Sequence, residues 1–377
     1  MRMEKIYTSL GLMSGTSMDG VDASIISSDG EKQYESIFNE YFEYDGDLYR
    51  DLVNLRNKIN SANDIILNSK LIDDIERKIT LFHAKICNKI INKNGNEIDL
   101  VGFHGQTIFH DANQKISKQL GDGSLLSNLL KKDVVYNFRA NDIANGGQGA
   151  PLAPIFHNLL INKTHMKLPV CVLNIGGIAN ITIIISDKNE DLKSQDIGPG
   201  NCLLDEWVRK HTNNRFDDGG KAASVGKIDK TILNQAIENF DNIKIGDNLS
   251  FDIKDFDLSF VRGLSYENGL STLTKFTSEI IYQSIANITK IYQNEKINIL
   301  VCGGGRKNLT LIENIRKKLP NNITLSLIDD LNINGDFVES QAFAYLAIRS
   351  LLKKPISFTN TTNVKKSCTG GDLVKNY

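Results

Sequence analysis

Two segments of the chain share one pattern, in which two apolar runs are separated by a glycine-rich turn. The first covers residues 5–27 and turns through residues 14–20, and the second covers residues 170–185 and turns at residues 176–177. Within residues 21–27 apolar and polar positions alternate, which is typical of a strand with one buried face. Each segment therefore predicts a pair of strands joined by a turn, and the shared pattern predicts two related halves.

The rest of the chain alternates between short apolar runs and longer segments with apolar residues at helical spacing. The polar tail beyond Pro355 is expected to be loose. Strands that alternate with helices in this way predict an α/β protein with mixed sheets. Runs typical of buried strands cover residues 100–103, 133–138 and 297–302. Helical spacing covers residues 48–91, 271–293 and 339–352.

Length and charge narrow the class of protein further. At 377 residues the chain is long for one hydrophobic core, so two domains are expected. A formal net charge of -1 gives no electrostatic reason to expect a nucleic-acid partner. The first residues lack the apolar core of a signal peptide, and no apolar run approaches the length of a membrane span. We therefore expect a cytoplasmic protein without a membrane partner.

The stretch GLMSGTSMDGVD at residues 11–22 is the most informative turn in the chain. Gly15 and Gly20 permit a close approach of the backbone, whose exposed N–H groups can hold phosphate oxygens. The carboxylates of Asp19 and Asp22 are oxygen ligands of the kind that Mg²⁺ prefers. A hairpin turn with solvated polar side chains explains the same residues equally well. The chain contains neither a GxxxxGKS/T loop nor a GxGxxG motif, which argues against P-loop and Rossmann enzymes.

The second half contains three further candidate motifs. NIGGIANIT at residues 174–182 is a second candidate phosphate loop, and the glycines in VCGGGRKN at residues 301–308 suit a nucleotide beside a helix N-terminus. Asp196 stands before a rigid Gly-Pro-Gly turn, where a carboxylate can accept a proton from an attacking oxygen. Taken singly, Asp196 is better interpreted as an Asx-type cap on a helix that begins near Leu203.

Polar residues at the ends of the predicted strands of the first half form another candidate site. Strand ends are common positions for binding residues in open α/β sheets. Taken alone, His104 fits a buried core histidine better than a catalytic group. The other candidates, which offer hydrogen-bonding and cationic groups, are Gln106, Thr107, Arg139, Gly147 and Gln148.

Taken together, these motifs resemble those of one family, the bacterial 1,6-anhydro-N-acetylmuramic acid kinases. The matching blocks lie in the family's order across nearly the whole chain, and one of them covers residues 339–347. Three blocks are specific to this family rather than to sugar kinases in general: GTSMDGVD at residues 15–22, GGQGAP at residues 146–151 and GPGN at residues 198–201.

The resemblance implies the fold that sugar kinases share with actin and the heat-shock ATPases. That fold is α/β, with two RNase H-like domains whose mixed sheets are flanked by helices and which enclose an inter-domain cleft. We expect domain I to comprise residues 1–150 and 336–377 and domain II to comprise residues 151–335. We also expect the two domains to close on binding. The family is commonly dimeric, so the resemblance implies a homodimer.

The resemblance also implies a reaction in the recycling of cell-wall sugars. ATP phosphorylates O6 of 1,6-anhydro-N-acetylmuramic acid while water opens the anhydro bridge, which gives N-acetylmuramic acid 6-phosphate and ADP. The cofactors are ATP and Mg²⁺, and the partner is a small amino sugar. Two alternatives stay open: a plain sugar or carboxylate kinase that phosphorylates a free hydroxyl, and a nucleotide-binding scaffold, against which Asp196 argues.

Roles carry over from the family to the matching residues. Asp196 matches the catalytic base that activates water, and Glu339 matches an acidic residue that assists at the bridge oxygen. An acidic residue at a helix start is also expected without any catalytic role. The metal ligands would be Asp19 and Asp22. ATP would bind at Gly15, Thr16, Ser17, Met18, Asp19, Gly20, Val21, Asp22, Gly176, Gly177, Gly303, Gly304 and Gly305. The sugar would bind at His104, Gln106, Thr107, Arg139, Gly147 and Gln148.

Overall fold

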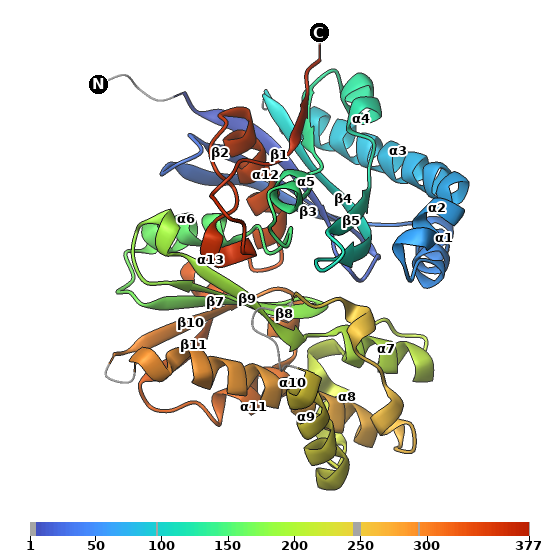
Figure 1. The fold of residues 1–377 in the computed structure, drawn as a ribbon, viewed down its shortest axis with the longest axis vertical. Helices are drawn as coiled ribbons and strands as arrows, with labels where there is room; N and C mark the ends of the chain where they lie inside the picture. The colour runs from blue at the N-terminus through green and yellow to red at the C-terminus, as the bar shows by residue number, and fades with distance from the viewer. Residues whose placement is uncertain (1–4, 96, 244–249, 293–294, 377) are drawn as a thin grey trace. The chain divides into compact units, whose positions relative to one another are not determined.

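The computed structural model describes residues 5–95, 97–243, 250–292 and 295–376. The chain forms two compact units (Figure 1). Unit 1 contains Met1–Thr164, Lys188–Leu192 and Phe337–Tyr377, and unit 2 contains His165–Asp187 and Lys193–Asp336. Each unit has one mixed sheet with helices packed on it, which confirms the predicted α/β class.

The sheet of unit 1 combines antiparallel and parallel strands. Its strands are β1 (Tyr7–Ser14), β2 (Gly20–Ser28), β3 (Tyr34–Glu43), β4 (Leu100–Asp111), β5 (Ile116–Leu120), β6 (Asp133–Tyr136) and β12 (Asp372–Val374). Strands β1, β2 and β3 run antiparallel, β4 lies parallel to β1, and β6 lies parallel to β4. At the margins, β5 pairs antiparallel with β4, and β12 pairs antiparallel with β6.

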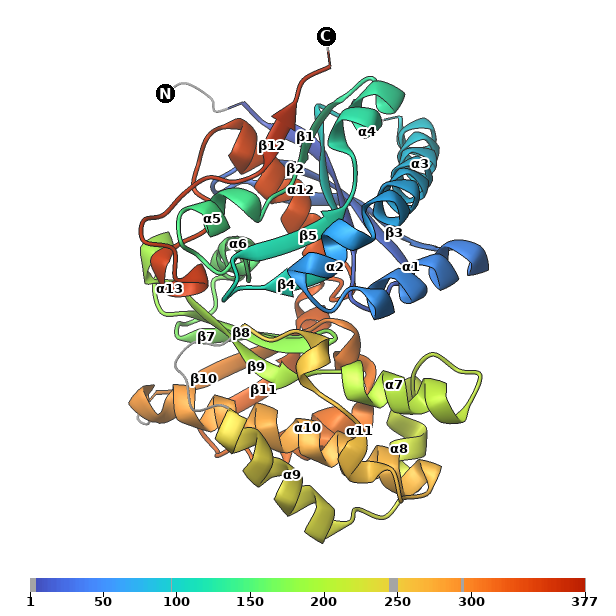
Figure 2. The ribbon, with the colours of Figure 1, turned by 45° about the vertical axis from the view of Figure 1, so that its right-hand side comes forward.

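Helices pack on both faces of this sheet. They are α1 (Gly46–Lys58), α2 (Ala62–Leu67), α3 (Ser69–Asn94), α4 (Gly123–Leu130), α5 (Ala140–Ala144), α6 (Pro154–Thr164), α12 (Val338–Leu351) and α13 (Thr359–Thr362). Helix α12 lies against β1, β2 and β4 (Figure 2). This packing requires Gly11, because a Cβ there would lie 2.0 Å from the carbonyl oxygen of Ser340. The neighbouring Leu10 and Leu12 belong to a core shared with α1 and α3, on the other face.

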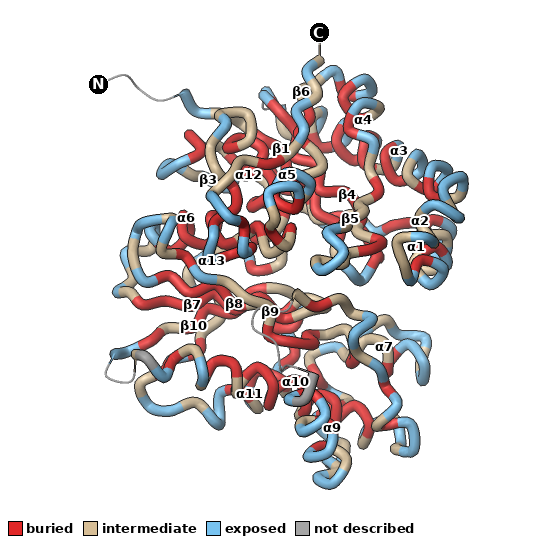
Figure 3. The backbone as a smooth tube through the Cα atoms, in the orientation of Figure 1, coloured by how far each residue is buried: buried red, intermediate tan, exposed pale blue. Residues whose placement is uncertain are grey.

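The sheet of unit 2 has five strands in the order β11-β10-β7-β8-β9. Its strands are β7 (Val170–Ile175), β8 (Ile178–Ile184), β9 (Lys193–Pro199), β10 (Ile297–Cys302) and β11 (Ile323–Leu327). Its helices are α7 (Cys202–His211), α8 (Lys221–Val225), α9 (Lys230–Ile243), α10 (Tyr266–Thr289) and α11 (Leu309–Arg316). Strands β7, β8 and β10 and helix α10 are buried along most of their length, as the red tube in Figure 3 shows. A core of apolar side chains from both holds the unit together.

The two sheets share one topology, which confirms the prediction of two related halves. In each sheet three successive antiparallel strands are followed by two parallel ones beside the first strand, β1-β2-β3 then β4 and β6, and β7-β8-β9 then β10 and β11. This order is that of the RNase H-like domains which the resemblance implied. The glycine-rich turns recognised in the sequence are the β1–β2 and β7–β8 turns of these related sheets.

The predicted helical segments differ from the observed ones mainly at breaks and ends. Residues 48–91 contain three helices rather than one, because Ser61 caps α2 and Asn68 separates α2 from α3. Helix α10 begins at Tyr266 behind the capping residue Ser265, and the predicted end at residue 293 lies outside the described residues. None of the helices in the described part of the chain combines the length and the apolar composition that a bilayer span requires.

The C-terminal segment is ordered, so the expectation of a loose tail beyond Pro355 is wrong. Ile356, Phe358 and Val364 are buried, and Ser357 forms an isolated bridge with Cys368. Strand β12 then pairs with β6 and adds a strand to the sheet of unit 1. The apolar residues of the segment are too few to form a periodic pattern, which is why its polar composition misled the prediction.

The boundary between the units also differs from the expected one. Residues 151–164, which we had assigned to domain II, lie in unit 1. They include helix α6, which packs against α12. Residues 188–192 also belong to unit 1, although the strands on either side of them belong to unit 2. Local composition does not reveal that the chain passes from one unit to the other and back, because the membership of a segment depends on packing with segments far away in the sequence.

Candidate active site

The first candidate phosphate loop is the turn between β1 and β2. Thr16 and Ser17 are exposed at its tip, whereas Met18 is buried and has a positive φ of 58°. The backbone N–H of Met18 donates to the carbonyl of Gly15 at 3.2 Å, and that of Tyr44 donates to the carbonyl of Asp19 at 2.9 Å. The buried Met18 side chain thus anchors the turn, and its polar tip remains accessible.

Two side chains from other elements hold the same loop by its carbonyl groups. Gln106 on β4 donates from Nε2 to the carbonyl of Gly15 at 2.9 Å, and Arg56 on α1 donates from Nη1 to the carbonyl of Thr16 at 2.8 Å. Gln106 was predicted as a sugar ligand, whereas no motif singled out Arg56. The Oε1 of Gln106 is buried and has no hydrogen-bond partner among the described residues. That oxygen is available as an acceptor for a ligand that donates a hydrogen bond.

The side chains of His83, Ser14 and Tyr44 are buried and linked by hydrogen bonds at the start of the β1–β2 turn. The Nδ1 of His83 lies 2.8 Å from the carbonyl of Ile79, so this nitrogen carries the proton of the neutral ring. Burial lowers the pKa of His83 to about 4, which keeps the ring neutral at physiological pH. Its Nε2 then accepts from the hydroxyl of Ser14 at 3.3 Å, and the Ser14 oxygen accepts from Tyr44 at 2.9 Å.

The predicted metal ligands suit Mg²⁺ bound together with phosphate. Asp19 is half-buried and accepts a hydrogen bond from the Ser17 hydroxyl at 2.5 Å, and Asp22 lies on β2 opposite Met13 of β1. Nowhere in the described residues do three or more His, Cys, Asp or Glu side chains gather as a metal cluster. Mg²⁺ often keeps several waters and takes one or two carboxylates plus phosphate oxygens, so this donor set fits it.

His104 and Arg139 form a hydrogen-bonded pair in unit 1. Arg139 donates from Nη2 to His104 Nε2 at 2.9 Å, and His104 Nδ1 lies 2.7 Å from the carbonyl of Gly105. Because arginine can only donate, His104 must be neutral with its proton on Nδ1. Burial, aided by the charge of Arg139, holds the pKa of His104 well below its ordinary value of 6.5. His104 is therefore buried like a core histidine, and its ring also orients the guanidinium group of Arg139.

The glycine-rich segment before α6 is held by a residue that the motifs did not identify. Asp142 on α5 is buried and accepts a hydrogen bond from the backbone N–H of Gly149 at 2.6 Å. Gly147 packs directly on this carboxylate, and Gln148 donates its backbone N–H to the carbonyl of Thr362 at 2.7 Å. The predicted sugar ligands Gly147 and Gln148 therefore lie in a segment whose conformation Asp142 and the C-terminal segment determine.

Of the other predicted unit 1 residues, Thr107 and Glu339 occupy different settings. Thr107 on β4 accepts a hydrogen bond from Gln119 at 3.2 Å. Glu339 lies in the first turn of α12, where burial raises the pKa of its carboxyl group, although the charge of Arg139 opposes this shift. Arg139 thus interacts with both His104 and Glu339, and the structure gathers these three predicted residues at one place in unit 1.

Replacing Glu339 by glutamine is expected to stabilise the protein at neutral and alkaline pH. A carboxyl group with a raised pKa in the folded state favours folding below its unfolded pKa, and that contribution is lost as the pH rises through the folded pKa. Glutamine stays neutral, so the melting temperature of Glu339→Gln should exceed that of the wild type by about 2–4 °C at pH 8 but not at pH 4. Thermal unfolding at both pH values tests this, with Glu35→Gln on exposed β3 as the control. An equal difference at both pH values would contradict it.

Unit 2 gathers three glycine-rich turns at one edge of its sheet. Strand β10 is parallel to β7, and β9 has the same direction because β8 is antiparallel to both β7 and β9. These three strands therefore end at the same edge. Residues 176–177 follow β7, residues 198–201 end β9, and residues 303–305 follow β10. Gly304 also begins a short 3-10 helix that leads to α11.

Asn201 joins these turns into one continuous backbone surface. Its N–H donates to the carbonyl of Gly176 at 2.8 Å, and its Nδ2 donates to the carbonyl of Ile175 at 3.2 Å. Gly305 packs so closely on Ile175 that a Cβ would lie 2.2 Å from Ile175 Cγ2. Gly303 has a φ of 78°, which favours glycine. Gly304 is exposed and residues 176–177 are partly exposed, and such glycine backbone beside helix starts suits a nucleotide and its phosphates.

Arg306 stabilises the turn at residues 303–305. Its guanidinium is buried and donates to Asp329 at 2.6 and 3.0 Å, to Asp336 at 2.7 Å, and to the carbonyl of Gly303 at 3.1 Å. The hydrogen bond with Arg306 keeps the pKa of Asp329 below its ordinary value. The sequence placed Arg306 in the glycine motif but did not predict this ion-pair cluster.

Asp196 lies in β9 opposite Asn180 of β8. Its Oδ2 accepts hydrogen bonds from the backbone N–H of Phe251 at 3.0 Å and from the Ser250 hydroxyl at 3.4 Å. Helix α7 has Asn201 as its N-cap residue, without a side-chain cap hydrogen bond. The helix-cap interpretation of Asp196 is therefore wrong, and this carboxylate is instead hydrogen-bonded by Ser250 and Phe251.

Comparison with known proteins agrees with the motifs. The family model for anhydro-N-acetylmuramic acid kinase matches residues 7–376. The anhydro-N-acetylmuramic acid kinase of Pelagibacter ubique is 70% identical over 375 residues, with 100% of both chains covered. That of Zymomonas mobilis is 38% identical over 372 residues, with 97% of this chain and 98% of the relative covered. Among solved structures, component A of Acidaminococcus fermentans (R)-2-hydroxyglutaryl-CoA dehydratase covers 92% of this chain and all of that chain, with 10% identity and a TM-score of 0.44.

A structural similarity at this level does not bear on function, so the assignment rests on the family model and the sequence relatives. Both cover nearly all of the chain, and both carry the same description. They confirm the family that the motifs predicted, and with it a kinase that transfers a phosphoryl group from ATP to a sugar. The chain belongs to the anhydro-N-acetylmuramic acid kinase family of phosphotransferases.

Proposed function

We propose that this kinase couples phosphorylation to hydrolysis of the anhydro bridge. ATP and water convert 1,6-anhydro-N-acetylmuramic acid into N-acetylmuramic acid 6-phosphate and ADP. The observation that carries the proposal is Asp196, a carboxylate on β9 of unit 2 that is oriented by Phe251 and not used as a helix cap. A plain phosphoryl transfer to a free hydroxyl requires no ordered water, whereas the bridged substrate does.

In the proposed step Asp196 accepts a proton from the water that attacks C1 of the sugar. The new C1–O bond forms as the C1–O6 bond breaks, and O6 takes the γ-phosphoryl group from ATP. The strained ring thus opens while its leaving oxygen is captured by phosphorus, so no free alkoxide accumulates. The Phe251 N–H and the Ser250 hydroxyl both donate to Oδ2, which would hold the carboxylate in a fixed orientation for proton transfer.

The glycine turns would bind the nucleotide. In unit 2 the turns at residues 176–177 and 303–305 would face the phosphates, and in unit 1 the exposed Thr16 and Ser17 would offer hydroxyls. Asp19 and Asp22 would hold Mg²⁺ through their carboxylate oxygens. The ion supplies positive charge that stabilises the transferring phosphoryl group.

The residues around Arg139 would bind the sugar. The guanidinium of Arg139 suits the lactyl carboxylate, and the neutral His104 keeps it oriented without adding charge. The acceptor Oε1 of Gln106 suits a hydroxyl or amide N–H of the sugar. Glu339, a carboxyl group whose pKa is raised by burial, would assist at the bridge oxygen. Thr107, Gly147 and Gln148 would complete this site.

Mass spectrometry of 1,6-anhydro-N-acetylmuramic acid after incubation with the protein, ATP and Mg²⁺ tests the proposal. The expected product is heavier than the substrate by the elements of one phosphoryl group and one water. A gain of the phosphoryl group alone would support the plain kinase. An unchanged sugar would contradict the proposal and direct the search to other sugar substrates.

The remaining expectations concern assembly and location. We propose a cytoplasmic homodimer, supported by the use of ATP and by the resemblance to a commonly dimeric family. Light scattering on the eluted protein should give twice the mass of the 42.0 kDa chain. A mass equal to that of one chain would exclude the dimer.

A further inference from the structure

We propose that Asp142 and Thr362 are positioning residues for sugar binding, because they orient Gly149 and through it Arg139. The inference deepens the proposed function and rests on it. Neither residue was predicted as a site residue from the sequence. Asp142 lies on α5, and Thr362 ends α13 in the C-terminal segment, so 220 positions separate them in the sequence.

The first step concerns the carboxylate of Asp142, which is 1% exposed. Its Oδ1 accepts the N–H of Gly149 at 2.6 Å, and its Oδ2 accepts the hydroxyl of Thr362 at 2.5 Å. Its backbone carbonyl also accepts the N–H of Gly147 at 2.9 Å. A buried carboxylate is stable only when such donors compensate its lost hydration, so these contacts depend on one another.

The second step concerns the segment that Asp142 holds. Gly149 has a φ of 77°, and Gly146 has a φ of 88°. Glycines have little conformational preference of their own, so their orientation must come from the groups that bind them. A Cβ at position 147 would lie 2.1 Å from Asp142 Oδ1, which shows how closely the segment packs on the carboxylate.

The third step leads from Gly149 to the sugar-binding residues. The carbonyl of Gly149 accepts a hydrogen bond from Arg139 Nη1 at 2.8 Å. Arg139 Nη2 in turn donates to His104 at 2.9 Å. Gly149 and His104 therefore both orient the guanidinium plane, and Gly149 is a glycine that Asp142 and Thr362 anchor. A bidentate contact with a carboxylate depends on this plane, so sugar binding should depend on the anchor.

The C-terminal segment thus contributes to the site from a distance. Thr362 is fully buried, and its carbonyl also accepts the N–H of Gln148 at 2.7 Å. If these contacts had only a structural role, their loss would lower the stability of the protein and leave sugar binding unchanged. A positioning role also predicts a selective effect on the sugar, because the phosphate loop is held separately by Gln106 and Arg56.

The test compares Thr362→Val with Thr362→Ser in the full-length protein. Valine keeps the size of threonine but removes the donor to Asp142, whereas serine keeps the hydroxyl. We expect Thr362→Val to raise the KM for the anhydro sugar about tenfold, since losing a buried hydrogen bond to a charged group affects affinity on this order, with the KM for ATP unchanged. Thr362→Ser should stay near the wild-type KM.

Other outcomes would overturn the inference. A lower melting temperature with both KM values unchanged would show a purely structural role, and an equal rise in both would show general loosening. If Thr362→Val does not fold, Asp142→Asn provides the second variant, because asparagine keeps an acceptor for Gly149 but loses the charge. It should raise the sugar KM selectively, and an unchanged value would overturn the inference. A wild-type protein without activity on the sugar would instead contradict the proposed function.

Discussion

Replacing Asp196 by asparagine is expected to reduce turnover of the anhydro sugar by about 10²- to 10⁴-fold, the usual effect of losing a general base. Asparagine can accept the same hydrogen bonds from Phe251 and Ser250, so the local structure should persist. It cannot accept the proton of the attacking water. Steady-state kinetics should therefore show a fall in kcat, and calorimetric titration should show ATP affinity close to that of the wild type.

A matched variant makes this result specific to Asp196. Asp218→Asn removes an exposed carboxylate of the same unit, which pairs with Lys221 at the surface, and should leave turnover unchanged. Unchanged sugar phosphorylation by Asp196→Asn would refute its role as the base. A loss of ATP binding by that variant would instead indicate a structural role at the nucleotide edge.

Replacing Arg306 by methionine is expected to lower the free energy of unfolding by about 1.5–3 kcal/mol, because it removes the buried donor of hydrogen bonds to two partly buried carboxylates. Arg306 lies beneath the glycine turn at residues 303–305 and binds Gly303 as well as Asp329 and Asp336. The variant should therefore also raise the KM for ATP. Chemical denaturation and kinetics on the folded fraction measure the two effects.

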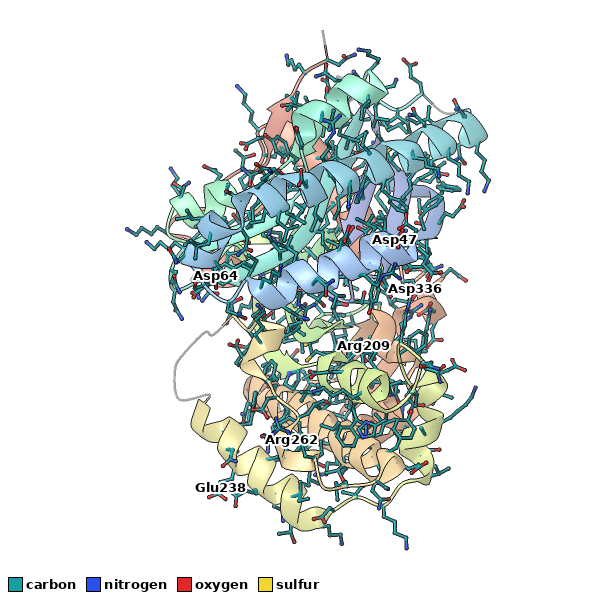
Figure 4. All side chains as sticks on the ribbon, turned by 90° about the vertical axis from the view of Figure 1, so that its right-hand side faces the viewer. Asp47, Asp64, Arg209, Glu238, Arg262 and Asp336 are labelled. Carbon is teal, nitrogen blue, oxygen red and sulfur yellow. The ribbon has the colours of Figure 1, made fainter. Side chains whose placement is uncertain are left out.

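The neighbouring lysine provides the control for this prediction. Lys307 pairs with the same Asp336, which is labelled in Figure 4, at 2.6 Å, but the Lys307 side chain is exposed. An exposed pair contributes at most about 1 kcal/mol, so Lys307→Met should change stability little. Similar losses of unfolding free energy in both variants would contradict the explanation that the burial of Arg306 causes its larger effect.

The individual motifs carried less information about the site than their arrangement in the fold. The loop at residues 11–22 and the turn at residues 303–305 were predicted as binding elements, but each by itself had an ordinary structural explanation. Strand topology decides the matter in unit 2, because the parallel direction of β7, β9 and β10 brings three turns to one edge. Asn201 then connects them, although the sequence presented it only as part of a turn.

The supporting residues show the limit of reading the chain alone. Asp142, Thr362, Arg56 and His83 hold the segments that contain predicted site residues, but each looks like an ordinary member of a helix or tail in the sequence. Their partners lie from 7 to 220 positions away. A side chain's hydrogen-bond partner depends on which segments pack together, and no local pattern records that.

The sequence by itself determined the α/β class, the two related halves, the glycine turns and the family. These follow from local rules, since apolar periodicity selects strands and helices and glycine permits the turns. The tertiary structure alone decided that Asp196 is not a helix cap, that residues 151–164 join unit 1, and that the C-terminal segment is ordered. Each of these depends on contacts between distant segments, whose free energy comes from burial and pairing that exist only once the chain has folded.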